Sequence, residues 1–106
     1  MPVTPREIIN ALARDYNTTA ADMLGHSRFQ HIMKARNAAA FVLRQRGNSF
    51  PQIGKFLGGR DHSTVINACK RFEDTAKGND WAIVRRYFRQ PDGIATPTES
   101  TDNGIA

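Results

Sequence analysis

The chain has 106 residues, 40% of them hydrophobic, which is enough for one small folded domain but not for a second core. Its formal net charge of +5 indicates a polyanionic partner, and its single cysteine, Cys69, excludes an internal disulfide. Because no apolar run approaches the roughly 20 residues that a membrane-spanning helix needs, we expect no membrane partner and a cytoplasmic location.

The first part of the chain predicts two helices. Residues 4–7 read Thr-Pro-Arg-Glu, a capping box with proline at the first helical position. Apolar residues then recur at helical spacing as far as Tyr16, so a first helix should end at Asn17 or Thr18. A short second helix is expected over residues 20–24, with Gly25 ending it.

A long third helix is predicted to begin at a second capping-box pattern, residues 27–30, and to run to about Arg46. Three consecutive alanines at 38–40 would let neighbouring helices approach closely, and Gly47 should end the helix. We expect its bulky apolar side chains to lie in the core: Phe29, Ile32, Met33, Phe41, Val42 and Leu43.

The remaining helices are predicted at 49–57, 61–75 and 81–88. Residues 49–52 form a third cap pattern, Gly58 and Gly59 allow a tight bend, and Asp61 can cap the helix that follows. The pattern predicts an all-α bundle of about six helices over residues 1–90. The polar tail at 91–106, with few apolar residues, is expected to be disordered.

The helices at 49–57 and 61–75, joined by a glycine bend, have the dimensions of a helix-turn-helix. The second helix of such a motif enters the major groove of DNA. Opposite its apolar stripe lie side chains that can hydrogen-bond base edges or contact phosphates: Ser63, Asn67, Lys70 and Arg71. The alternative is an ordinary helical hairpin with a solvated basic face, in which His62 is simply a helix-start residue.

The block Gly-Gly-Arg-Asp-His-Ser-Thr-Val at 58–65, with Ile53-Gly54 before it and Ala-Cys-Lys-Arg at 68–71 after it, resembles one family. It is similar to the C-terminal DNA-binding domain of the bacterial replication initiator DnaA, over about residues 4–90. The resemblance implies a fold of the TrpR and DnaA C-terminal-domain type. It also implies that one set of side chains reads bases in the major groove: Arg60, Asp61, His62, Ser63 and Thr64, to which the position of Asn67 adds a sixth.

Contacts to the DNA backbone are expected from residues around this motif: Ser49, Gln52, Lys55, Lys70 and Arg71. The resemblance further implies that the start of the third helix supplies a basic residue to the minor groove. The family pattern there is Arg-Pro-Arg-like, whereas this chain has Lys34-Ala35-Arg36. Because lysine lacks the planar fork of arginine, we expect weaker minor-groove readout by Lys34, or a shift of that contact to Arg36 or Arg28.

The sequence contains no Gly-x-x-x-x-Gly-Lys-Ser/Thr loop, so ATP binding of that type, enzymatic activity and a cofactor are not expected. His26, His31 and His62 lack the spacing of metal ligands. The leading hypothesis is a free-standing, monomeric reader of double-stranded DnaA-box-like sites, associated with the nucleoid, that regulates replication initiation or transcription. The alternatives are an interaction module that acts on replication proteins and a nucleoid-type binder without sequence preference.

Overall fold

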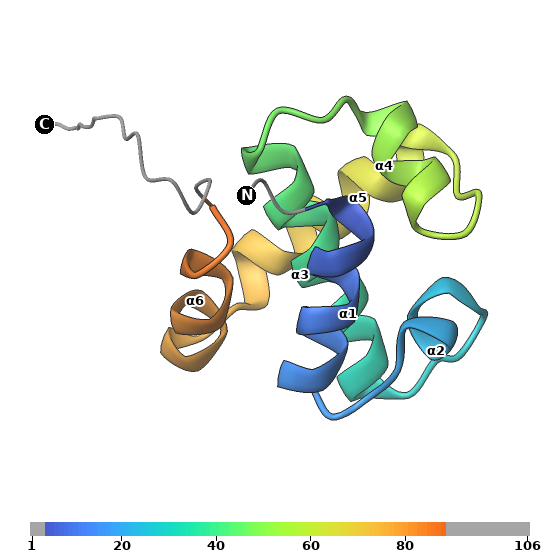
Figure 1. The fold of residues 1–106 in the computed structure, drawn as a ribbon. Helices are drawn as coiled ribbons and strands as arrows, with labels where there is room; N and C mark the ends of the chain where they lie inside the picture. Colours follow the sequence, from blue (N-terminus) through green and yellow to red (C-terminus); the bar gives the residue numbers. More distant parts are fainter. Residues whose placement is uncertain (1–3, 89–106) are drawn as a thin grey trace, which may run out of the picture.

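The computed structural model describes residues 4–88, and the predicted tail at 91–106 lies outside them. Over the described range the chain is all-α, as predicted, with six helices and no strand (Figure 1). The helices are α1 Pro5–Asp15, α2 Ala20–Leu24, α3 Gln30–Gln45, α4 Phe50–Phe56, α5 His62–Thr75 and α6 Gly78–Arg85.

Two of the predicted capping boxes are present. The Thr4 hydroxyl accepts from the Glu7 N–H at 3.2 Å, while the Glu7 carboxylate accepts from the Thr4 N–H at 2.9 Å. Ser49 and Gln52 exchange the same pair of bonds at 3.2 and 2.9 Å. Each box satisfies two backbone groups that the first turn leaves without a helical partner, so the starts of α1 and α4 are set locally.

The capping box predicted at residues 27–30 is wrong. The helix begins at Gln30, and Phe29 occupies the cap position without a side-chain hydrogen bond to the first turn. The Ser27 hydroxyl accepts from the Phe29 N–H at 3.4 Å, inside the loop. The predicted burial of Phe29 is also wrong, because its side chain is 71% exposed. The helix therefore starts too late to turn this ring into the core.

The sixth helix begins at Gly78, three residues before the predicted start, because Asp80 caps it. One Asp80 carboxylate oxygen accepts from the Lys77 N–H at 2.9 Å, and the other accepts from the Tyr16 hydroxyl at 2.8 Å. Tyr87, just after the helix, donates its hydroxyl to Asp15 at 2.7 Å. These bonds tie α6 to the end of α1.

The core is built around α3, which runs through the middle of the molecule (Figure 1). Its alanines at 38–40 are fully buried, and α5 packs on it with the predicted apolar stripe inward. The Phe41 ring lies 4.9 Å from that of Phe72, 5.3 Å from that of Trp81 and 5.8 Å from that of Phe88. Cys69 belongs to this core, where burial raises the pKa of its thiol to about 11. Within residues 4–88, no helix combines the length and apolar character that crossing a membrane requires.

Both tyrosines should resist ionisation as long as the protein is folded. Burial first, and then the hydrogen bond to a carboxylate, raises the pKa of Tyr16 and of Tyr87 above the ordinary value of 10.0. This contribution to stability is fully present below pH 10 and is lost as the pH rises toward the folded-state values, since only the unfolded chain then ionises. Absorbance at 295 nm and far-UV circular dichroism, followed together from pH 8 upward, should change in one transition. Phenolate absorbance that develops near pH 10 while the helical signal persists would contradict this expectation.

Candidate nucleic-acid interface

The angle between α4 and α5 is set by close backbone contacts in the turn between them. Gly58 and Gly59 have φ values of +87° and +84°, a region in which side chains are strained. A Cβ atom on Gly58 would overlap the carbonyl oxygen of Leu24, and one on Gly54 would overlap the carbonyl oxygen of Arg60. The predicted glycine bend is present, and it brings the start of α5 beside the end of α2.

Asp61 caps α5, as predicted. Its carboxylate accepts from the Thr64 N–H at 3.0 Å, and hydrogen bonding from Thr64 holds the pKa of this exposed carboxyl below its usual range. The Asp61 carboxylate is therefore charged at neutral pH, and its negative charge interacts favourably with the positive end of the helix dipole. The structure thus gives Asp61 a local role, while its contact with a base stays a prediction.

The outer face of α5 is open to solvent along its length. Its buried stripe is formed by Val65, Cys69 and Phe72. All six candidate DNA contacts on the helix itself are exposed: His62, Ser63, Thr64, Asn67, Lys70 and Arg71. A hollow of about 220 Å³ runs between this helix and α3, with Thr64, Asn67 and Arg71 on the α5 side. The structure therefore brings these predicted residues together on one accessible surface.

Arg60, predicted to read a base, is turned toward the protein. Its guanidinium donates to the backbone carbonyls of Leu57, Leu24 and Gly25, and burial lowers its pKa. Those bonds join the turn before α5 to the loop between α2 and α3. In this conformation Arg60 holds two segments of the chain together, and its base contact stays a prediction.

Arg36 holds the same loop from the other side. Its Nε donates to the Met23 carbonyl at 2.8 Å, and its Nη2 donates to the carbonyls of Ser27, Gly25 and Asp22 at 3.1, 3.3 and 3.4 Å. Burial lowers the pKa of this guanidinium, and the positive charge of Arg60 lowers it further. We name these two arginines with their carbonyl partners the arginine clamp. No sequence pattern predicts this clamp, because Arg36 bonds carbonyls 9 to 14 positions away.

The loop held by the clamp, residues 25–29, forms a positively charged surface. A hollow of about 270 Å³ beside it is lined by six residues, none of them acidic: His26, Ser27, Arg28, Met33, Arg36 and Arg60. Arg28 is exposed there, whereas Lys34 lines a different hollow with Thr75 and Asp80, toward the end of α5. Of the three cations predicted for the minor groove, Arg28 and Arg36 therefore lie together and Lys34 lies apart.

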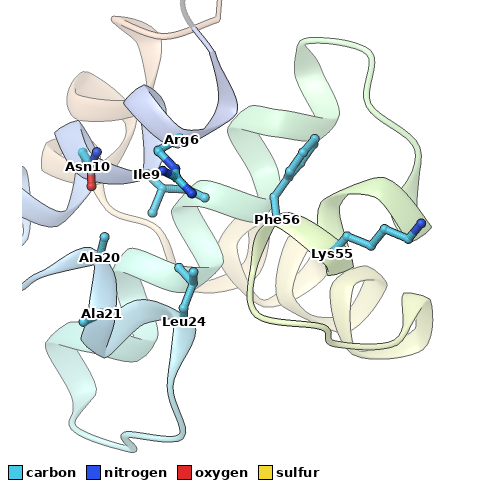
Figure 2. Close-up of a pocket in the computed structure, with 8 residues that line it drawn as sticks. All are labelled: Arg6, Ile9, Asn10, Ala20, Ala21, Leu24, Lys55 and Phe56. Carbon is cyan, nitrogen blue, oxygen red and sulfur yellow. The ribbon is translucent and has the colours of Figure 1, made fainter.

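On α4, Ser49 and Gln52 are engaged with each other in the capping box, and Lys55 is exposed. Lys55 borders a cleft of about 470 Å³ between α1, α2 and α4 (Figure 2). The cleft has apolar side chains and two cations but no acidic, histidine or cysteine side chain: Arg6, Ile9, Asn10, Ala20, Ala21, Leu24, Lys55 and Phe56. No group of three or more metal-ligating side chains occurs within residues 4–88. The cleft thus offers apolar and cationic contacts rather than an acid–base pair.

Residues 5–72 match a protein family described as "Bacterial dnaA protein helix-turn-helix". The chain is 33% identical over 92 residues to the chromosomal replication initiator protein DnaA of Crocosphaera subtropica, covering 86% of this chain and 20% of that protein. It is 33% identical over 93 residues to the DnaA of Cereibacter sphaeroides, covering 82% and 20%. With the DnaA of Bartonella quintana the identity is 39% over 69 residues, covering 64% and 14%. The chain thus spans no more than about a fifth of the length of these relatives.

Proposed function

The chain belongs to the bacterial DnaA helix-turn-helix family, and from this premise we propose that it binds double-stranded DNA at DnaA-box-like sequences through α5. Family membership supports DNA binding in general. The observation that supports sequence-specific reading is the exposed first half of α5, where His62, Ser63 and Thr64 follow a charged cap. Side chains of this kind at the start of a recognition helix can hydrogen-bond base edges in the major groove.

We divide the contacts by their chemistry. Base contacts are assigned to Asp61, His62, Ser63, Thr64 and Asn67, and to Arg60 once its guanidinium exchanges its backbone carbonyl partners for a base. Contacts to the sugar–phosphate backbone are assigned to Ser49, Gln52, Lys55, Lys70 and Arg71. In the minor groove we favour Arg28, because Arg36 is occupied with loop carbonyls and Lys34 lies toward the other end of α5. Arg36 then supports DNA binding by holding the loop rather than by touching a base.

A protein that binds DNA in this way would compete with other DNA-binding proteins for DnaA-box-like sites. The sequence has no phosphate-binding Gly-x-x-x-x-Gly-Lys-Ser/Thr loop, so we propose that the chain acts without ATP hydrolysis, as a monomer on the nucleoid. Occupancy of boxes would regulate replication initiation, or transcription where a box lies in a promoter. Both roles follow from site occupancy alone.

Titration of the protein with duplexes that contain or lack a DnaA box, at several salt concentrations, tests the proposal. We expect a large specificity ratio for the wild type. His62→Ala and Thr64→Ala should each lose about 1–3 kcal/mol on the box alone, since each removes a base contact. Lys70→Ala is the matched control: it should weaken both duplexes alike and lower the salt slope by about 1.

Two results would point elsewhere. Equal binding to both duplexes with a steep salt slope would identify a DNA binder without sequence preference. No binding to either duplex would leave an interaction module that acts on other proteins. If His62→Ala keeps the full specificity ratio, the assignment of His62 to a base is wrong.

A further inference from the structure

Phe29 is the most exposed large hydrophobic side chain within residues 4–88. It is 71% exposed, and the next, Leu24, is 37% exposed. Leu24 precedes the loop 25–29 and Phe29 is its last residue. Leu24 also borders the cleft on α1 and α4, which gives it partners. The nearest aromatic neighbour of Phe29 is His31, at 6.3 Å between ring centroids and on the same helix end. The ring therefore lacks the packing that would account for it in the free protein.

The backbone that carries Phe29 is fixed on both sides. On one side the arginine clamp binds the carbonyls of Gly25 and Ser27. On the other, the Phe29 carbonyl accepts from the Ile32 and Met33 N–H groups at 3.0 and 2.9 Å, as the first acceptor of α3. A side chain presented by a fixed backbone loses little conformational freedom when it binds. The exposure of Phe29 is thus a property of an ordered surface.

This surface adjoins the start of the proposed recognition helix. The Arg60 guanidinium, one residue before the cap of α5, bonds the Gly25 carbonyl, and the Gly58 backbone lies against Leu24. Figure 1 shows the end of α2 and the turn between α4 and α5 on the same side of the molecule. The loop 25–29 contains no acid, and Arg28 directly precedes Phe29. A duplex seated on α5 would bring its anionic backbone against this loop.

We propose that Phe29 is an apolar wedge that enters the minor groove next to the major groove read by α5, with Arg28 at its mouth. The inference rests on the proposed function. The strand that borders the major groove is also a wall of the adjacent minor groove, so a side chain beside the start of α5 reaches that groove across one strand. Phenylalanine inserted there partly unstacks a base step and bends the duplex by roughly 20–90° toward the major groove. Pyrimidine–purine steps unstack most easily, so the wedge adds a preference for sequence that α5 does not touch.

The test compares Phe29→Ala, Phe29→Trp and Arg28→Ala on a box duplex at several salt concentrations. Dyes at the two duplex ends report bending by energy transfer, and 2-aminopurine in the minor-groove half of the site reports unstacking. Phe29→Ala should weaken binding about 5- to 100-fold. It should abolish the bend and the 2-aminopurine signal, yet keep the salt slope and the discrimination due to His62. Phe29→Trp should retain the bend, whereas Arg28→Ala should lower the salt slope by about 1. Far-UV circular dichroism should be unchanged for Phe29→Ala, because the ring is exposed.

Failure of the wedge and failure of the proposed function give different results. If the wild type discriminates between duplexes and Phe29→Ala binds and bends like the wild type, the wedge is wrong and the proposed function stands. If the wild type binds no duplex, both are wrong. Vesicles of phosphatidylglycerol and phosphatidylcholine provide the comparison with a lipid surface. Loss of vesicle binding in Phe29→Ala, with duplex binding intact, would assign the ring to a membrane and overturn the wedge.

Discussion

Gly54→Ala should destabilise the domain by about 3 kcal/mol or more and abolish DNA binding, although Gly54 lies in a helix where alanine is ordinarily favourable. An added Cβ would overlap the Arg60 carbonyl oxygen and come within 3.1 Å of the carbonyl carbon. The turn cannot simply withdraw, because the Gly54 carbonyl accepts from the N–H groups of Gly59 and Arg60 at 2.9 and 3.0 Å. The substitution must therefore open the turn that positions α5.

Urea unfolding followed by circular dichroism measures this effect, and two other glycines serve as controls. Gly78 begins α6 with no heavy atom within 4 Å of an added Cβ, so Gly78→Ala should be neutral or stabilise by up to about 1 kcal/mol. Gly59 has the same open space but a φ of +84°, so Gly59→Ala should cost about 1–2 kcal/mol from backbone strain alone. A Gly54→Ala protein that unfolds at the wild-type urea concentration would show that the contact between α4 and the turn does not restrict position 54.

Arg36→Ala should lower the free energy of unfolding by about 2–3 kcal/mol, because it removes charged hydrogen bonds to partly buried acceptors. The guanidinium donates to the carbonyls of Asp22, Met23, Gly25 and Ser27, and of these four carbonyls that of Gly25 is also bonded by Arg60. Arg36→Lys should recover only part of the loss, since a point charge cannot match the guanidinium fork. DNA binding should weaken as well, because the loop that carries Arg28 loses its position.

Hydrogen exchange of the amides at 22–29, together with urea unfolding, separates the clamp from a direct DNA contact. A clamp residue raises loop exchange in the free protein and lowers stability. A residue that only touches DNA changes neither quantity in the free protein. If Arg36→Ala weakens duplex binding while stability and loop exchange stay at wild-type values, Arg36 contacts the minor groove, which is one of the two alternatives to Lys34 that the sequence left open.

The sequence predicted those parts of the fold that short-range chemistry decides. The boxes at Thr4 and Ser49 were confirmed because donor and acceptor lie three residues apart. The same pattern at Ser27 failed, because the clamp fixes the carbonyl of that residue in a loop and delays the helix to Gln30. The helix start at Pro5 and the bend at Gly58 were predicted correctly as well, because proline restricts φ and glycine allows a positive φ.

The candidate site was predictable in position but not in the conformation of its arginines. The stripe of α5 determines which side is exposed, so Ser63 and Asn67 could be placed from spacing. Arg36 and Arg60 were assigned to DNA by resemblance, and both guanidiniums meet backbone carbonyls far along the chain. A long, flexible arginine side chain can reach several partners, and which of them it bonds depends on the packed fold. The exposure of Phe29 was missed because helical spacing alone favours burial of an apolar side chain.

The aromatic cluster around Phe41 includes residues that lie beyond the segment, 5–72, covered by the family model. The family match stops at Phe72, yet the Phe41 ring is also covered by Trp81 and Phe88, and α6 is fastened to α1 through Tyr16 and Asp80. Grafting only the matched segment onto another protein would transfer the reading helix but leave an aromatic face of α3 bare to water. A portable version of this module has to carry its last helix, which contributes nothing to the proposed reading of DNA and closes the core on which the reading helix rests.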